Sequence, residues 1–84
     1  MDAAARIGQF IRENFLVSPT EGLVDDTSLI ATGIVDSTGM LEVINFLEAE
    51  FGIAIQDHET VPENLETIHR MAGFVERKRD ARAA

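Results

Sequence analysis

The sequence predicts an all-α fold, a small four-helix bundle of three main helices and one short helix, with a long loop between the first two main helices. Three segments carry apolar residues at the spacing of one helix face, and no segment alternates with the two-residue period of a strand. The 84 residues, 45% of them hydrophobic, suffice for one small core. We therefore expect a single domain over 1–79 and a frayed tail over 80–84.

The first helix is expected over residues 2–16. Asp2 can cap its N-terminus or lie in its first turn. The apolar residues recur at i, i+3, i+4 and i+8, the spacing of one buried stripe: Ile7, Phe10, Ile11 and Phe15. We interpret these phenylalanines as core residues and not as a ligand pocket.

Residues 17–36 form a long connection that begins with turn-forming Ser, Pro and Gly. Such a long segment is unusual in a small domain unless its own apolar side chains pack. Four residues can do so: Leu23, Leu29, Ile30 and Ile34. We expect a short helical turn at Leu29 and Ile30, and a bend at Gly33 that lets Ile34 enter the core.

The second helix is expected over residues 37–51. Asp36 and Ser37 are both residue types that cap helices, and Gly52 is the residue expected just after a helix end. The buried stripe consists of Val43, Ile44, Leu47 and Phe51, with Met40 nearby.

Residues 53–66 begin with an apolar plug and continue with a polar turn at Pro62 and one helical turn. The plug consists of Ile53 and Ile55. The last helix is expected over 67–79, with Thr67 as its cap. Its stripe consists of Ile68, Met71, Ala72 and Val75, and its C-terminal dipole is matched by Arg77, Lys78 and Arg79.

Charge is unevenly distributed along the chain. Residues 1–69 hold 13 Asp and Glu against two Arg, net −11, whereas residues 70–84 have a net charge of +3. An acidic body argues against a nucleic-acid partner, because phosphate contacts need Lys and Arg. It suits docking onto basic patches of partner proteins, although acidity that serves only solubility explains the charge equally well.

Several functional classes are excluded by what the chain lacks. It has no cysteine, and its two histidines, His58 and His69, are not at metal-ligand spacing. Neither Asp25 nor Asp26 starts an EF-hand pattern, because apolar residues fall at required ligand positions. A catalytic Ser–His–acid site needs an enclosed pocket that so small a chain can hardly provide. We therefore expect no metal site and no enzymatic activity.

No apolar run is as long as a membrane span, and the first residues lack the apolar region of a signal peptide. We therefore expect a cytoplasmic monomer that does not insert into membranes.

One stretch carries the functional prediction. Asp36 and Ser37 directly precede an amphipathic helix, and the positive N-terminal end of a helix favours a phosphate ester. Residues 26–37 resemble the loop that enters the second helix of acyl carrier proteins, and residues 41–53 resemble that helix and its exit. The resemblance extends over roughly residues 5–78.

The resemblance implies that the Ser37 hydroxyl carries 4′-phosphopantetheine through a phosphodiester made by a phosphopantetheinyl transferase. It implies a carrier, not an enzyme, which holds an acyl or aminoacyl group as a thioester in fatty acid or lipid biosynthesis. Asp36 would orient the modifying enzyme or its metal. The implied partners are a dedicated adenylating ligase and acyl-using transferases or synthases.

Two further sets of residues follow from the resemblance. The family's partner-docking face corresponds to Thr38, Leu41, Glu42, Asn45 and Glu48. A lining that could shelter an acyl chain would consist of Ile30, Leu47, Ile55 and Met71, although we favour a plain core role for all four.

The sequence departs from the common family pattern directly after the serine, where Thr38 and Gly39 replace a leucine and an acid. A glycine in a helix costs about 1 kcal/mol relative to alanine. Gly39 could loosen the first turn or let another backbone approach closely. This departure is similar to D-alanyl and aminoacyl carrier proteins, so we favour a specialised carrier. The rival interpretation is a helical adaptor that binds partners without a prosthetic group.

Overall fold

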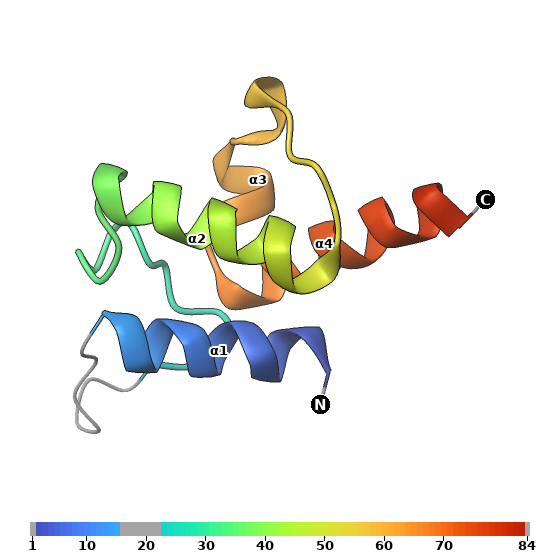
Figure 1. Ribbon diagram of the computed structural model, residues 1–84. Coiled ribbons are helices and arrows are strands. Elements are labelled where there is room, and N and C mark those ends of the chain that lie inside the picture. Colours follow the sequence, from blue (N-terminus) through green and yellow to red (C-terminus); the bar gives the residue numbers. More distant parts are fainter. Residues whose placement is uncertain (1, 16–22, 84) are drawn as a thin grey trace.

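The computed structural model describes residues 2–15 and 23–83, and within these ranges it contains helices and turns but no strand. The elements in chain order are α1 (Ala3–Asn14), α2 (Ser37–Phe51), the 3-10 helix η2 (Asp57–Glu59), α3 (Pro62–Leu65) and α4 (Ile68–Ala83). Figure 1 shows that α1 and α2 run along the length of the molecule, with α3 and η2 on the side of α2 that faces away from α1. The predicted all-helical bundle is confirmed.

Local capping signals set the helix boundaries, as the sequence predicted. The Asp2 carboxylate accepts a hydrogen bond from the Ala5 N–H at 2.8 Å. Thr67 caps α4, because its hydroxyl accepts from the Arg70 N–H at 3.0 Å. Gly52 ends α2 in the left-handed conformation, with φ of 65°. The last residue predicted for the first helix, residue 16, lies outside the described ranges.

The last helix is longer than predicted. Residues 80–83, which we expected to belong to a frayed tail, continue α4. The basic residues that we assigned to the C-terminal dipole therefore lie before the last turn, and their partners are on other elements. These contacts are Arg77 to the Asn64 side chain, Lys78 to Glu59, and Arg79 over the Phe51 ring.

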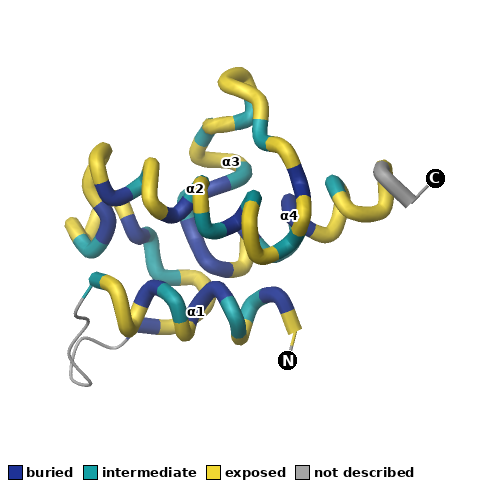
Figure 2. The backbone as a smooth tube through the Cα atoms, viewed as in Figure 1, coloured by how far each residue is buried: buried dark blue, intermediate teal, exposed yellow. Residues whose placement is uncertain are grey.

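A single core lies between the helices, where Figure 2 shows their buried faces turned towards one another. Residues from α1, the loop, α2, α3 and α4 all contribute: Ile7, Ile11, Leu23, Leu29, Val35, Val43, Leu47, Ile53, Leu65, Ile68, Met71, Phe74 and Val75. Phe74 was not predicted. The predicted core residues Phe10, Phe15 and Phe51 are only half-buried and pack against this cluster.

The loop before α2 is described from residue 23 onwards. Its predicted helical turn is present, since the Thr32 N–H donates to the Ser28 carbonyl at 3.2 Å, and Gly33 makes the bend with φ of 76°. After this bend Val35 is fully buried and Ile34 only partly, which corrects the prediction. Three hydrogen bonds tie the loop to the helices: Arg12 to the Leu23 carbonyl, the His69 N–H to the Asp25 carbonyl, and the Leu29 N–H to the Glu66 carbonyl.

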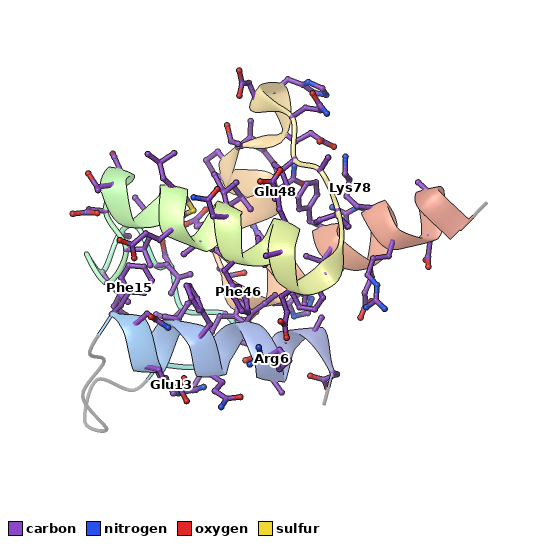
Figure 3. All side chains as sticks on the ribbon, in the orientation of Figure 1. Arg6, Glu13, Phe15, Phe46, Glu48 and Lys78 are labelled. Atoms are coloured by element: carbon purple, nitrogen blue, oxygen red, sulfur yellow. The ribbon has the colours of Figure 1, made fainter. Side chains whose placement is uncertain are left out.

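Four phenylalanines form what we call the aromatic row, along the junction of α1 and α2, and two of them, Phe15 and Phe46, are labelled in Figure 3. In order these are Phe15, Phe10, Phe46 and Phe51. The central pair stacks with ring centroids 4.0 Å apart, and the outer rings meet it edge-on at 6.2 Å. The Arg6 guanidinium lies 5.5 Å from the Phe46 centroid and pairs with Glu50 at 2.6 Å. The row therefore joins α1 to α2.

Candidate functional site

The start of α2 is set by Asp36. Its backbone is extended, with φ of −94° and ψ of −174°, and its carboxylate accepts from the Gly39 N–H at 2.6 Å. Its carbonyl accepts the first helical hydrogen bond, from the Met40 N–H at 2.8 Å. Asp36 is therefore the cap of α2, and Ser37 is the first residue of the helix.

Because Asp36 caps α2, the Ser37 hydroxyl is not used for capping. Ser37 and Thr38 are exposed, whereas Gly39 is buried. The N–H groups of a helix's first residues have no carbonyl one turn earlier to bind, and they carry the positive end of the helix dipole. An exposed hydroxyl at this position fits a phosphate ester, because the helix N-terminus favours negative charge there.

Gly39 leaves room for an aromatic ring. A Cβ atom at this position would lie 2.6 Å from Cε1 of Phe15 and 3.2 Å from the Asp36 carboxylate. This steric conflict accounts for a glycine in the first turn of α2 despite its helix cost of about 1 kcal/mol. The neighbour that approaches closely is thus a side chain from α1 and not a backbone segment.

Four residues of the predicted docking face lie exposed on one side of α2, at the spacing i, i+3, i+4 and i+7: Thr38, Leu41, Glu42 and Asn45. Leu41 is 62% exposed, a high value for a large apolar side chain. Glu48 is different, because it is half-buried and its carboxylate accepts from the Ile55 N–H at 2.9 Å (Figure 3). Glu48 therefore holds the segment after α2.

Three of the four residues considered for an acyl-chain lining lie in or against the core cluster. Leu47 and Met71 are fully buried in it and Ile55 packs half-buried against it, whereas Ile30 is 52% exposed. Ile30 instead borders an open pocket of about 140 Å³ near the first turns of α2. Its other lining residues are Met40, Thr60, Val61, Pro62, Leu65 and Glu66. Sequence reasoning missed this lining because the loop and α3 meet only in the folded chain.

The histidines lie on separate elements, His58 on η2 and His69 on α4, and both are exposed. Over residues 2–15 and 23–83, no group of three or more His, Asp or Glu side chains could hold a metal ion. None of the helices in these same ranges combines the length and apolar character needed to cross a membrane.

The chain is a small acidic helical bundle with an exposed serine at the start of its second long helix, which is the arrangement that the resemblance to small carrier proteins led us to expect. No family model matches the chain. A probable acyl carrier protein, PigG, from Serratia sp. (strain ATCC 39006), is 33% identical over 67 residues, which cover 80% of this chain and 77% of PigG.

Among solved structures, the crystal structure of an FAD-dependent dehydrogenase contains a chain that superposes with a TM-score of 0.73 at 28% identity. The match covers 82% of this chain and 97% of that one. Given the identity with PigG and its coverage, this chain belongs to the acyl carrier protein family, whose function is to carry and not to catalyse.

Proposed function

We propose that Ser37 carries 4′-phosphopantetheine, joined through a phosphodiester by a phosphopantetheinyl transferase that uses coenzyme A. The observation that supports this is the capping of α2 by Asp36, which leaves the Ser37 hydroxyl exposed at a helix N-terminus. When bound, the prosthetic group supplies a thiol that holds an acyl or aminoacyl group as a thioester. The chain itself presents the attachment point and docks onto the enzymes that load and use the group.

The exposed face of α2 is the proposed docking surface. Thr38, Leu41, Glu42 and Asn45 lie on it within the first nine residues of α2 and combine one large apolar side chain with polar and acidic ones. The net charge of −8 favours partners with basic patches. We propose an adenylating ligase and acyl-using transferases or synthases as partners. A further proposed partner is an FAD-dependent dehydrogenase that would oxidise the carried group. The likeness of this chain to a chain in the structure of such a dehydrogenase supports this proposal.

The packing of the core favours a small cargo. Leu47 and Met71 are fully buried within the core cluster, so a long acyl chain would have to displace packed side chains to lie against them. The open pocket beside Met40 measures about 140 Å³, which is close to the ~150 Å³ of a cavity that holds benzene. This supports a specialised carrier of an aminoacyl or short acyl group over a carrier of long fatty acyl chains.

The test is the intact mass of the protein after incubation with coenzyme A and a broad-specificity phosphopantetheinyl transferase. The wild type is expected to gain one phosphopantetheine and the Ser37→Ala variant none. Because Asp36 forms the cap, Ser37→Ala is expected to fold and melt like the wild type.

Thr38→Ala is the matched control, since it removes the neighbouring exposed hydroxyl and should still gain the full mass. A gain on Ser37→Ala would place the attachment elsewhere. No gain on the wild type, even with the transferase from the same source, would support the helical adaptor instead.

A further inference from the structure

We propose that Phe15 is a positioning residue for the modification of Ser37. Its ring occupies the space left by Gly39 and so fixes the first turn of α2, with Ser37 on the outer side of that turn. This proposal rests on the proposed attachment at Ser37. It explains why Phe15 stands at the C-terminal end of α1 and why Gly39 stands in the first turn of α2, where its low helix propensity is unfavourable.

The Phe15 ring is held from α1 and from α2. Phe15 ends α1, where its N–H donates to the Ile11 carbonyl at 3.0 Å. Its ring meets Phe10 edge-on, at 6.2 Å and 75°, and Phe10 stacks in turn on Phe46 of α2, at 4.0 Å and 11°. Figure 3 shows Phe15 between the end of α1 and the beginning of α2. The ring therefore contacts α1 through Phe10 and the first turn of α2 through Gly39.

Gly39 connects this ring to the cap. Its N–H donates to the Asp36 carboxylate at 2.6 Å, and the position of its missing Cβ is 2.6 Å from the Phe15 ring and 3.2 Å from the same carboxylate. Ring, glycine and cap are thus packed as one unit. Ser37 lies in the same turn, between the cap and the glycine. A shift of the ring would consequently reorient the turn that presents the serine hydroxyl.

Four proteins test the proposal: wild type, Gly39→Ala, Phe15→Ala and the double variant. The measurements are the melting temperature and, well below it, the kcat and KM for transfer of phosphopantetheine from coenzyme A by the transferase. In Gly39→Ala the added methyl collides with the ring, so the melting temperature should fall and kcat should drop about tenfold, since misplacing a reacting group lowers its rate steeply. KM for the protein should change little, because Leu41, Glu42 and Asn45 of the docking face lie beyond the first turn.

The effect of Gly39→Ala on the melting temperature should change from a loss to a gain when the Phe15 ring is absent. In the Phe15→Ala background the colliding ring is absent, and the closest remaining neighbour of the methyl added at position 39 is the Asp36 carboxylate, at 3.2 Å. The gain in helix propensity should then prevail, so Gly39→Ala should raise the melting temperature and recover part of kcat. Phe15→Ala alone should lower kcat and speed hydrogen exchange of the Gly39 amide. If Gly39→Ala does not fold, the kcat of Phe15→Ala and the hydrogen-exchange rate of its Gly39 amide test the positioning role instead.

Gly73→Ala in α4 is the matched control, since its Cβ would meet only the Arg77 side chain at 3.4 Å, an ordinary contact. It should raise the melting temperature and leave kcat unchanged. If Gly39→Ala behaves like Gly73→Ala, the positioning role is overturned while the attachment at Ser37 stands. If the wild type gains no mass, the proposed attachment fails and the role fails with it, whatever the melting temperatures show.

Discussion

At the scale of single residues, the choice between two adjacent capping side chains determines whether a hydroxyl is free. Asp36 and Ser37 are both favourable caps. Asp36 takes the position, because its carboxylate reaches the Gly39 N–H at 2.6 Å. The hydroxyl of Ser37 is then not used to cap the helix. The cap therefore matters both for the stability of α2 and for the access of an enzyme to Ser37.

The cap can be tested by two substitutions at the same position. Asp36→Ala removes the hydrogen bond to Gly39 and should lower the free energy of unfolding by about 1 kcal/mol. Asp36→Asn keeps an accepting oxygen and should remain close to the wild type, because asparagine caps helices about as well as aspartate. Urea unfolding followed by circular dichroism measures both. Equal losses in the two variants would mean that the negative charge, and not the hydrogen bond, stabilises the helix start.

How much of the site follows from sequence differs from residue to residue. The place of Ser37 at the start of a helix could be predicted, because cap, serine and apolar stripe are adjacent in the chain. The contacts of Phe15 and Glu48 could not be predicted. Phe15 packs against Gly39, which is far along the sequence, and Glu48 binds a residue beyond the turn that ends α2. Glu48 fits an exposed face by its spacing, yet its carboxylate binds the Ile55 N–H.

At the scale of elements, an ion pair ties η2 to α4. Lys78 Nζ lies 2.8 Å and 3.1 Å from the two carboxylate oxygens of Glu59. The Gln56 N–H donates to the same carboxylate at 2.9 Å. The Lys78 hydrogen bond first, and then that of the Gln56 N–H, hold the pKa of Glu59 below its usual value. These contacts favour the ionised carboxylate in the folded protein.

This pKa shift predicts how stability depends on pH. Because the pKa of Glu59 is lower in the folded than in the unfolded protein, its stabilising contribution is present above the usual pKa of a glutamate. It is lost as pH falls through the lower, folded value. Glu59→Gln should therefore lower the melting temperature near neutral pH and differ less from the wild type in strong acid.

Thermal melts of both proteins across this acid range measure the effect. Glu63→Gln, an exposed position in the first turn of α3, serves as the control. A difference between wild type and Glu59→Gln that stays constant with pH would contradict the role of the ion pair.

The elements that could be predicted are those with local signals at both ends. Residues 37–51 were predicted as a helix and are one, since Asp36 starts it and Gly52 ends it. The last helix was predicted to end four residues too early, because Arg77 to Arg79 were interpreted as the charges of a helix end. In the folded chain these residues contact η2, α3 and the end of α2, which no local pattern reveals.

At the scale of the whole molecule, charge should govern stability. Residues 1–69 have a net charge of −11, and their self-repulsion in a small bundle opposes folding. Raising the ionic strength to about 0.15 M shortens the screening length to roughly 8 Å, so the melting temperature should rise. Differential scanning calorimetry in sodium chloride measures this.

Magnesium chloride at the same ionic strength is the control for specific metal binding. Equal shifts in both salts would identify general screening. A melting temperature that responds to neither salt would show that repulsion is not an important term.

The shape of the molecule has a practical consequence. The described chain measures 41 × 27 × 19 Å along its principal axes, and α2 begins at the end opposite to that where α4 finishes (Figure 1). A biotin or a surface linker joined behind α4 would therefore leave Ser37 facing outward from the support. Protein arrayed in this way on a sensor chip should remain open to enzymes, so that loading and unloading could be followed in real time on one immobilised sample.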